Sequence, residues 1–237
     1  MRVKQDIRYI LRKKKYDISG IKMKQTKALI IEIINFLDKN LKNKDQLEIL
    51  NTLKNISLEK ENYNYQNPNT PPKENSLQKA LKSIKSEPLI PLRKSIFLAL
   101  NEMKWNIDNG SFYEKNSGIG KHYLNGNMNS ELIGPIHGSF ISNEFRLGLF
   151  LLEPKIFYKD HKHEAPELYL NLTNGTHWRF KNRIWQEKSA GSIIYNEPNM
   201  VHAMRVNEVP FLSIWCWPYN SSKKCVLVPR KDWVELE

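Results

Sequence analysis

The sequence has very few cysteines and no long apolar stretch. Its two cysteines, Cys216 and Cys225, are too few for a disulfide framework, so both thiols are expected to be reduced. No apolar run approaches the roughly 20 residues that a transmembrane helix needs. The first residues, M-R-V-K-Q-D-I-R-Y-I-L-R-K-K-K, lack the apolar core of a secretory signal. These absences argue against disulfide-rich secreted and helical membrane proteins, and predict a cytoplasmic protein without a membrane partner.

The positive charge is concentrated in the first part of the chain. Residues 1–104 hold 22 Lys and Arg against 11 Asp and Glu, which gives +11, whereas residues 105–237 hold 15 against 14, which gives +1. Such a basic segment can bind nucleic acid. No helix-turn-helix spacing and no interleaved aromatic residues accompany the charge. We therefore interpret the lysines as a solvated helical surface and expect no nucleic-acid partner.

Residues 1–110 are predicted to form a helical N-terminal region. Apolar side chains recur at helical spacing in five segments, 2–16, 24–40, 44–57, 76–85 and 92–105. The Asn- and Pro-rich stretch 60–75 is predicted to be an exposed loop. The apolar stripes are expected to pack inside the chain, although they leave a homodimer possible.

Residues 111–237 are predicted to form a β domain. Gly and Asn punctuate the chain from about residue 106, and short strands are expected near 141–152, 155–159, 167–172, 176–180, 183–187, 192–195, 201–206, 211–217 and 224–228. Several short strands at close spacing are typical of a sandwich or barrel. The predicted fold class is therefore α+β, with a helical layer followed by a β-barrel.

The stretch Y-K-D-H-K-H-E-A-P-E-L-Y carries the chemistry. His161 and His163 are two residues apart, so in a strand their side chains point to the same face. Glu167 adds a carboxylate four residues later, and His202 is the best candidate for a third imidazole from a distant strand. Two or three imidazoles and a carboxylate suit a first-row divalent metal ion.

This pattern resembles the cupin superfamily, whose first motif is H-x-H-x(3,4)-E-x(6)-G and whose second motif supplies a later His. That resemblance implies a double-stranded β-helix barrel. The run from Glu167 to Gly175 is one residue longer than in most cupins, and Pro198-x3-His202 is one residue shorter than the usual second motif. In these two spacings, and in the tyrosine at each end of the metal motif, the sequence resembles a narrower family. That family is the metal-dependent dimethylsulfoniopropionate (DMSP) lyases.

The resemblance covers roughly residues 140 to 220. The pattern Y-x-x-H-x-H-x-x-x-E-x-Y is followed by a G-x-x-W-R-like stretch and by P-x-x-x-H-A-M. Here these segments are 158–169, 175–179 and 198–204. The resemblance implies that His161, His163, Glu167 and His202 bind the metal ion. His and Glu ligands do not select among zinc, iron, nickel, manganese and cobalt.

The resemblance also implies the reaction, a β-elimination of DMSP to dimethyl sulfide and acrylate. A tyrosine can act as the base if a nearby metal ion lowers its pKa from about 10. Tyr169 shares a face with Glu167, so we favour it as the base. Tyr158 lies three residues before His161, and strict alternation puts it on the other face unless the strand bends. We therefore expect it to assist or to position the substrate.

The sulfonium group of DMSP has no hydrogen-bond donor, so aromatic faces suit it. Candidate substrate-binding residues are Trp178, Trp215 and Tyr123, with Trp217 and Tyr195 as further possibilities. Two other functions stay open: another metal-dependent cupin enzyme, such as a dioxygenase or isomerase, and a non-catalytic cupin sensor or regulator whose basic helices bind DNA.

Overall fold

The computed structural model describes residues 23–236, and the predicted helix over 2–16 lies outside them. A first helix covers residues 23–40, and α2 (Lys44–Lys54) and α3 (Glu74–Ser83) follow it. These three confirm the helices expected over 24–40, 44–57 and 76–85. The last predicted helix is shorter than expected, because α4 (Ile90–Ala99) gives way to the 3-10 turn η3 (Leu100–Glu102).

Short turns and helices complete the helical part of the described chain. These are η1 (Lys60–Asn62), η2 (Glu87–Leu89), α5 (Lys121–Gly126) and α6 (Trp233–Leu236). The stretch 60–75 is mostly irregular, as predicted, with η1 and a β-bridge from Tyr63 to Phe140 at its start.

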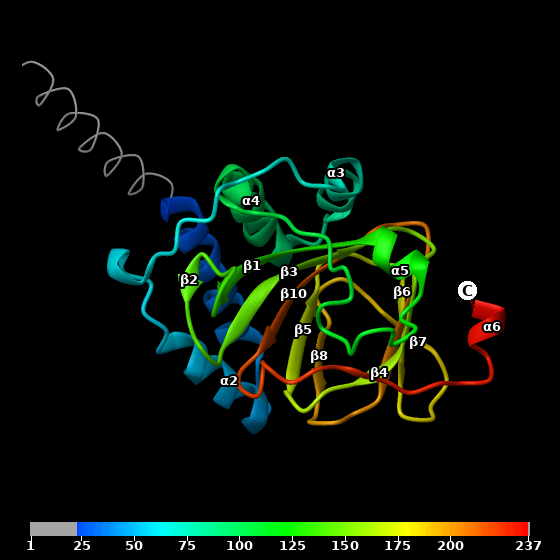
Figure 1. Ribbon diagram of the computed structural model, residues 1–237. Helices are drawn as coiled ribbons and strands as arrows, with labels where there is room; N and C mark the ends of the chain where they lie inside the picture. The colour runs from blue at the N-terminus through cyan, green and yellow to red at the C-terminus, as the bar shows by residue number, and fades with distance from the viewer. Residues whose placement is uncertain (1–22, 237) are drawn as a thin grey trace, which may run out of the picture.

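Eleven strands form two sheets among the described residues. The six-stranded sheet has the order β2-β1-β3-β10-β5-β8, and the five-stranded sheet has the order β11-β4-β9-β6-β7. The strands are β1 (Asn127–Gly134), β2 (Phe140–Ile141), β3 (Arg146–Leu152), β4 (Phe157–Lys162), β5 (Glu167–Asn171), β6 (Thr176–Phe180), β7 (Gln186–Lys188), β8 (Ile193–Asn196), β9 (His202–Val206), β10 (Phe211–Trp217) and β11 (Val226–Leu227). Every predicted strand segment overlaps one of them. Figure 1 shows the β strands filling the C-terminal part of the chain.

The six-stranded sheet is apolar on both faces, which explains the run L-G-L-F-L-L in β3. Leu147, Leu149 and Leu151 pack with the helices in one core cluster, and Phe150 and Leu152 belong to a second cluster that holds the site strands' aromatic residues. Strands β5 and β10 alternate in the same way. The molecule is therefore layered, with helices against one face of the six-stranded sheet and the five-stranded sheet against the other (Figure 1).

The helical stripes are buried within the chain, as the sequence predicted. Leu29, Ile33, Leu50 and Leu77 share one cluster with the strands of the six-stranded sheet. Phe97 and Leu98 of α4 stay exposed, so the possible homodimer and the division at residue 110 both stay predictions. Among residues 23–236, no helix combines the length and the apolar character that crossing a membrane would need.

Strand β1 and helix α5 are among the elements that the sequence pattern did not predict. Their sequence K-H-Y-L-N-G-N-M-N-S-E-L-I-G is polar and rich in Asn, so it was interpreted as a punctuated loop. In the structure Asn127 is fully buried, and its side chain binds the backbone of Asp108, Tyr123 and Leu124. The Asn127 side chain thus supplies hydrogen bonds to backbone groups that are buried in the interior. These partners come from other segments, so the local sequence does not reveal them.

Candidate metal and substrate site

Three histidines meet between the sheets. His161 and His202 are cross-strand partners on β4 and β9, and His163 follows the end of β4. One ring nitrogen of each lies within 4.8 Å of the others, and all three side chains are buried. The predicted strand periodicity therefore brings His161, His163 and His202 together at one place.

Each imidazole is anchored through its Nδ1 atom to a backbone carbonyl. The partners are Lys159 O at 2.8 Å from His161, Ala165 O at 2.7 Å from His163 and Met200 O at 2.9 Å from His202. A carbonyl can only accept, so Nδ1 of each ring carries a hydrogen, and Nε2 of a neutral ring keeps its lone pair. The buried Nε2 of His202 has no aligned hydrogen-bond partner, whereas Nε2 of His163 faces the Glu167 carboxylate at 3.3 Å. Buried imidazoles that are grouped and oriented in this way suit a divalent metal ion, and this group can hold one.

Glu167 lies beside this histidine group. Its Oε2 atom is 3.3 Å from Nε2 of both His163 and His202, and it also accepts a hydrogen bond from Asn196 Nδ2 at 3.1 Å. Its other oxygen accepts a hydrogen bond of 2.7 Å from Trp217 Nε1. The carboxylate is thus oriented from two sides, and its metal coordination stays a prediction.

Burial and charge oppose each other at these groups. Burial alone would raise the pKa of Glu167, but His163 and His202 outweigh it and hold that pKa well below its usual range. Burial lowers the pKa of His161 well below its usual value, and the neighbouring imidazoles lower it further. Burial also acts to lower the pKa of His163, but the Glu167 carboxylate raises it overall. His161 is therefore neutral at physiological pH, the state in which an imidazole binds metal.

A β-bulge in β4 determines the direction of the Tyr158 side chain. On the β4–β9 ladder Tyr158 pairs with Met204, whereas His161 pairs with His202, so β4 carries one extra residue between them. The extra residue returns Tyr158 to the face of His161, and the two rings stack with centroids 4.3 Å apart. Tyr158 therefore belongs to the same cavity as the histidines.

The hydroxyl groups of Tyr158 and Tyr169, the two candidate bases, have different neighbours. Tyr113 donates a hydrogen bond of 2.6 Å to the hydroxyl of Tyr158. Burial raises the pKa of Tyr158 well above its usual value, although the hydrogen bond from Tyr113 opposes that shift. Burial likewise raises the pKa of Tyr169, and there the Glu167 carboxylate raises it further.

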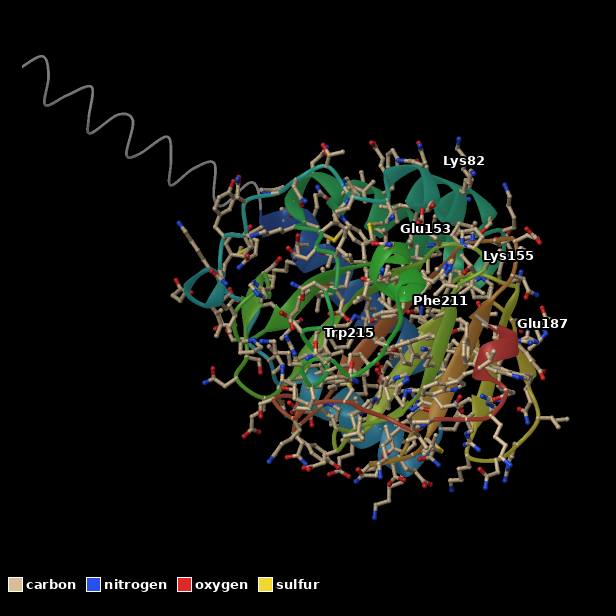
Figure 2. The ribbon with its side chains drawn as sticks, turned by 45° about the vertical axis from the view of Figure 1, so that its right-hand side comes forward. Lys82, Glu153, Lys155, Glu187, Phe211 and Trp215 are labelled. Carbon is tan, nitrogen blue, oxygen red and sulfur yellow. The ribbon has the colours of Figure 1, made fainter. Side chains whose placement is uncertain are left out.

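A cavity of about 40 Å³ lies between the sheets and connects these groups. It is lined by His161, Glu167, Tyr158, Tyr169, Tyr123, Trp215, Trp217, Phe112, Phe150, Asp108, Asn129 and Cys225. Two of the predicted substrate-binding residues, Tyr123 and Trp215, thus lie on its wall. Figure 2 shows Trp215 and Phe211 within the body of the molecule, whereas Lys82 and Glu187 lie at its edge.

Trp178 occupies a different position from the one predicted for a residue that contacts substrate. It is fully buried and packs edge-on against Tyr169, with ring centroids 5.1 Å apart, and stacks on Phe180. It therefore supports the ring of Tyr169 from behind, and direct contact with a substrate stays a prediction for this residue.

A larger depression of about 570 Å³ adjoins the cavity and shares Asp108, Phe112, Asn129 and Trp215 with it. Arg146 and Glu131, joined by an ion pair of 2.6 Å, lie on its wall. Trp215 lies opposite Gly148 across the β3–β10 ladder, where a Cβ atom would come within 3.0 Å of its indole nitrogen. This glycine makes room for the indole between the two spaces.

Several residues of the site were missed by the sequence analysis. Asp108, Phe112 and Tyr113 come from the segment before α5, and Asn196 comes from β8. Their sequences, D-N-G-S-F-Y and Y-N-E-P, were interpreted as turns or strand ends. Side chains of irregular segments carry no periodic signal that could have identified these residues.

Comparison with solved structures places this arrangement among known folds. A chain solved in work on the DMSP lyases RdDddP and RnDddQII aligns with a TM-score of 0.64 and 17% identity, over 88% of this chain and 100% of that chain. The DMSP lyase DddQ from Ruegeria pomeroyi DSS-3 aligns with a TM-score of 0.60 and 16% identity, over 85% and 96% of the two chains. No protein with a curated description matches this chain.

The helical layer, the two facing sheets and the buried histidines define an α+β protein whose interior can hold a metal ion. The sequence model of the dimethylsulfoniopropionate lyases matches residues 28–213, which is most of the chain. The chain belongs to the DMSP lyase family, a family of carbon–sulfur lyases, and the predicted family and fold class are both confirmed.

Proposed function

We propose that this protein cleaves DMSP to dimethyl sulfide and acrylate by β-elimination. A base removes a proton from Cα, the Cα–Cβ double bond forms, and the Cβ–S bond breaks with its electron pair on sulfur. The family membership supports this reaction. The observation that carries it is one cavity lined by Tyr158, Tyr169, His161 and Glu167, beside the buried histidine group.

The proposed metal ligands are His161, His163 and His202, with Glu167 beside them. A divalent ion held there supplies positive charge that stabilises a bound carboxylate and favours the phenolate form of a nearby tyrosine. The identity of the metal is open among zinc, iron, nickel, manganese and cobalt. Trp217 and Asn196 hold the Glu167 carboxylate in place whichever ion binds.

Tyr169 is our proposed base, and Tyr158 is the second candidate. Tyr169 lies on the cavity two residues after Glu167, as the strand period requires. A specific observation favours Tyr158, because its oxygen accepts a hydrogen bond from Tyr113 and so has a donor that stabilises a phenolate. If Tyr169 is the base, Tyr169→Phe should be the inactive variant, and if Tyr158 is the base, Tyr158→Phe should be.

The test is to load the purified protein with each metal in turn, add DMSP, and measure dimethyl sulfide in the headspace and acrylate in solution. Removal of the base lowers kcat by about 10²–10⁴-fold. We expect Tyr169→Phe to show that loss with unchanged metal content, and Tyr158→Phe to lose about tenfold. Absence of dimethyl sulfide with every metal, in protein that binds metal, would refute the proposed function.

Tyr113→Phe is the matched control for the two assignments. It removes only the hydroxyl that donates to Tyr158 and leaves the surroundings of Tyr169 unchanged. A small effect of Tyr113→Phe together with a large effect of Tyr169→Phe supports Tyr169. Full activity of Tyr169→Phe, with a large loss in both Tyr158→Phe and Tyr113→Phe, would transfer the role of base to Tyr158.

A further inference from the structure

Asp108 is a carboxylate on the cavity wall that the proposed mechanism does not use. It lies in the segment between η3 and α5, and only 3% of its surface is exposed. It lines the cavity that reaches His161 and Glu167, and it also lines the adjoining depression. A buried carboxylate is costly unless hydrogen bonds or an opposite charge stabilise it, so its presence at this point calls for a reason.

Asp108 is held rigidly by uncharged donors. Its Oδ1 atom accepts hydrogen bonds from the amides of Gly110 at 2.9 Å and Ser111 at 3.0 Å, and a longer one of 3.4 Å from the Ser111 hydroxyl. Its Oδ2 atom accepts a hydrogen bond of 2.8 Å from the Tyr123 hydroxyl. These donors fix the orientation of the carboxylate, and none of them is a cation.

Aromatic rings surround this carboxylate on the cavity wall. Phe112, Tyr123 and Trp215 line the cavity with it, and Phe112 packs edge-on against Trp215 with centroids 6.5 Å apart. Aromatic faces and a carboxylate together attract cations that cannot donate hydrogen bonds, because the ring quadrupole and the charge act in the same direction. A sulfonium is such a cation.

Asp108 and the histidines lie at opposite ends of a stack of rings. The ring of Tyr123, whose hydroxyl binds Asp108, stacks on Tyr158 with centroids 4.5 Å apart. Tyr158 in turn stacks on His161 at 4.3 Å. The cavity wall therefore carries Asp108 beside Tyr123 and, beyond Tyr158, His161 together with the Glu167 carboxylate.

We infer that Asp108, with Phe112 and Trp215, binds the dimethylsulfonium end of the zwitterionic substrate and so fixes its orientation. The inference rests on the proposed function for the identity of the substrate. With the sulfonium at Asp108 and the substrate carboxylate at the histidine end, the Cα–H bond lies in between, along the wall that carries Tyr158 and Tyr169. Asp108 thereby selects small carboxylates that bear a cationic group at the far end.

The test compares two ligands of the same shape and different charge. The cationic probe, 3-(trimethylammonio)propionate, has a trimethylammonium head, and the neutral isostere, 4,4-dimethylpentanoate, has an uncharged tert-butyl head, while both keep the carboxylate. Calorimetry on metal-loaded protein gives the affinity of each for the wild type and for Asp108→Asn, which keeps an acceptor oxygen for the loop amides. We expect the wild type to prefer the cationic probe by at least about tenfold and Asp108→Asn to lose that preference with little change for the neutral isostere.

Ser111→Ala is the matched control, because it removes a hydrogen bond to Asp108 and leaves the charge in place. It should keep the preference for the cationic probe. If Asp108→Asn does not fold, Phe112→Leu is the second variant, since Phe112 is only half-buried and its loss removes one aromatic face. That variant should reduce the preference about threefold. An equal weakening of both ligands, or an unchanged preference, would overturn the inference.

These readouts separate the inference from the proposed function. Binding of the cationic probe that depends on Asp108, without any release of dimethyl sulfide, would refute the reaction and leave the cation site standing. Release of dimethyl sulfide with a KM for DMSP that is the same in Asp108→Asn and the wild type would refute the cation site and leave the reaction standing.

Discussion

The two faces of strand β4 carry polar groups in opposite states. On the outer face the fully buried carboxylate of Asp160 is saturated: Arg179 binds it through Nη2 at 2.5 Å and Nε at 3.1 Å, and Trp233 Nε1 donates at 2.9 Å. On the inner face His161 is anchored through Nδ1 alone, and its partner His202 has an Nε2 atom without an aligned donor.

This difference separates scaffold from site. A buried polar group whose partners are complete contributes to one rigid structure, whereas one that is oriented but left open is prepared for a ligand. The two faces are also connected, because Asp160 lies within the bulge that turns Tyr158 toward His161. Helix α6 carries Trp233 to the outer face from the C-terminal end of the chain (Figure 1).

The largest expected effect comes from removing an open group on the inner face. His202→Ala should abolish tight metal binding and bring the release of dimethyl sulfide below detection, because one of three grouped imidazoles is lost. The fold should persist, since the loss of the hydrogen bond from Nδ1 to the Met200 carbonyl costs only about 1 kcal/mol. Elemental analysis after gel filtration measures the metal, and far-UV circular dichroism measures the fold.

His177→Ala is the control for this substitution. His177 lies on β6, at a half-exposed position away from the histidine group, with a long contact of 3.5 Å to Asn207. It should keep both metal and turnover. Retention of metal and activity by His202→Ala would show that the open nitrogen on the inner face is not a ligand.

A smaller effect on activity and a large one on stability are expected on the outer face. Asp160→Ala leaves the buried Arg179 guanidinium without its bidentate partner, and removing one member of a buried pair lowers the free energy of unfolding by about 3–5 kcal/mol. Turnover should fall as well, because the bulge that positions Tyr158 is no longer held. Chemical denaturation measures the first quantity, and headspace assays measure the second.

Asp232→Ala provides the comparison for Asp160→Ala. Asp232 also pairs with Arg179, but 39% of its side chain is exposed, so solvent screens the pair and the expected loss is below about 1 kcal/mol. Equal losses of stability in the two variants would contradict the view that Asp160 is the central partner of Arg179 and Trp233 on the outer face.

The histidine group could be predicted from the sequence because it follows strand periodicity. His161 and His163 share a face by alternation, Tyr169 follows Glu167 by the same rule, and the helical stripes of the first half are buried as their spacing indicated. These features depend on residues a few positions apart, and local geometry decides them.

The remaining parts of the site depend on irregularities or on distant contacts. The bulge in β4 reverses the face of Tyr158, and its extra residue is held by Arg179, which is 19 positions away from Asp160. Asp108 reaches the cavity from an irregular segment. Strand β1 was not predicted because it begins at Asn127, a polar residue that is buried and whose side chain binds backbone groups of other segments. No local pattern encodes these partners, so only the folded chain reveals them.

The smallest of these effects compares two indoles that donate to carboxylates on opposite faces. Trp217 Nε1 donates to Glu167 at 2.7 Å on the inner face, and Trp233 Nε1 donates to Asp160 at 2.9 Å on the outer face. Trp217→Phe keeps an aromatic ring and removes the indole donor, so the Glu167 carboxylate loses the hydrogen bond to its Oε1 atom and keeps the one from Asn196. Loss of such a supporting hydrogen bond weakens metal affinity by about 10–100-fold, and competition with a chelator measures it.

Trp233→Phe makes the same chemical change on the outer face. It should leave metal affinity unchanged and lower the free energy of unfolding by about 1 kcal/mol, the usual contribution of a single hydrogen bond. If both substitutions weakened metal binding equally, the two faces would form one coupled unit, and the distinction between a saturated scaffold and an open site would not hold. If only Trp217→Phe did so, the inner carboxylate would be shown to act on the metal through its orientation, since the ring and its packing against His163, with centroids 4.7 Å apart in the native protein, are retained.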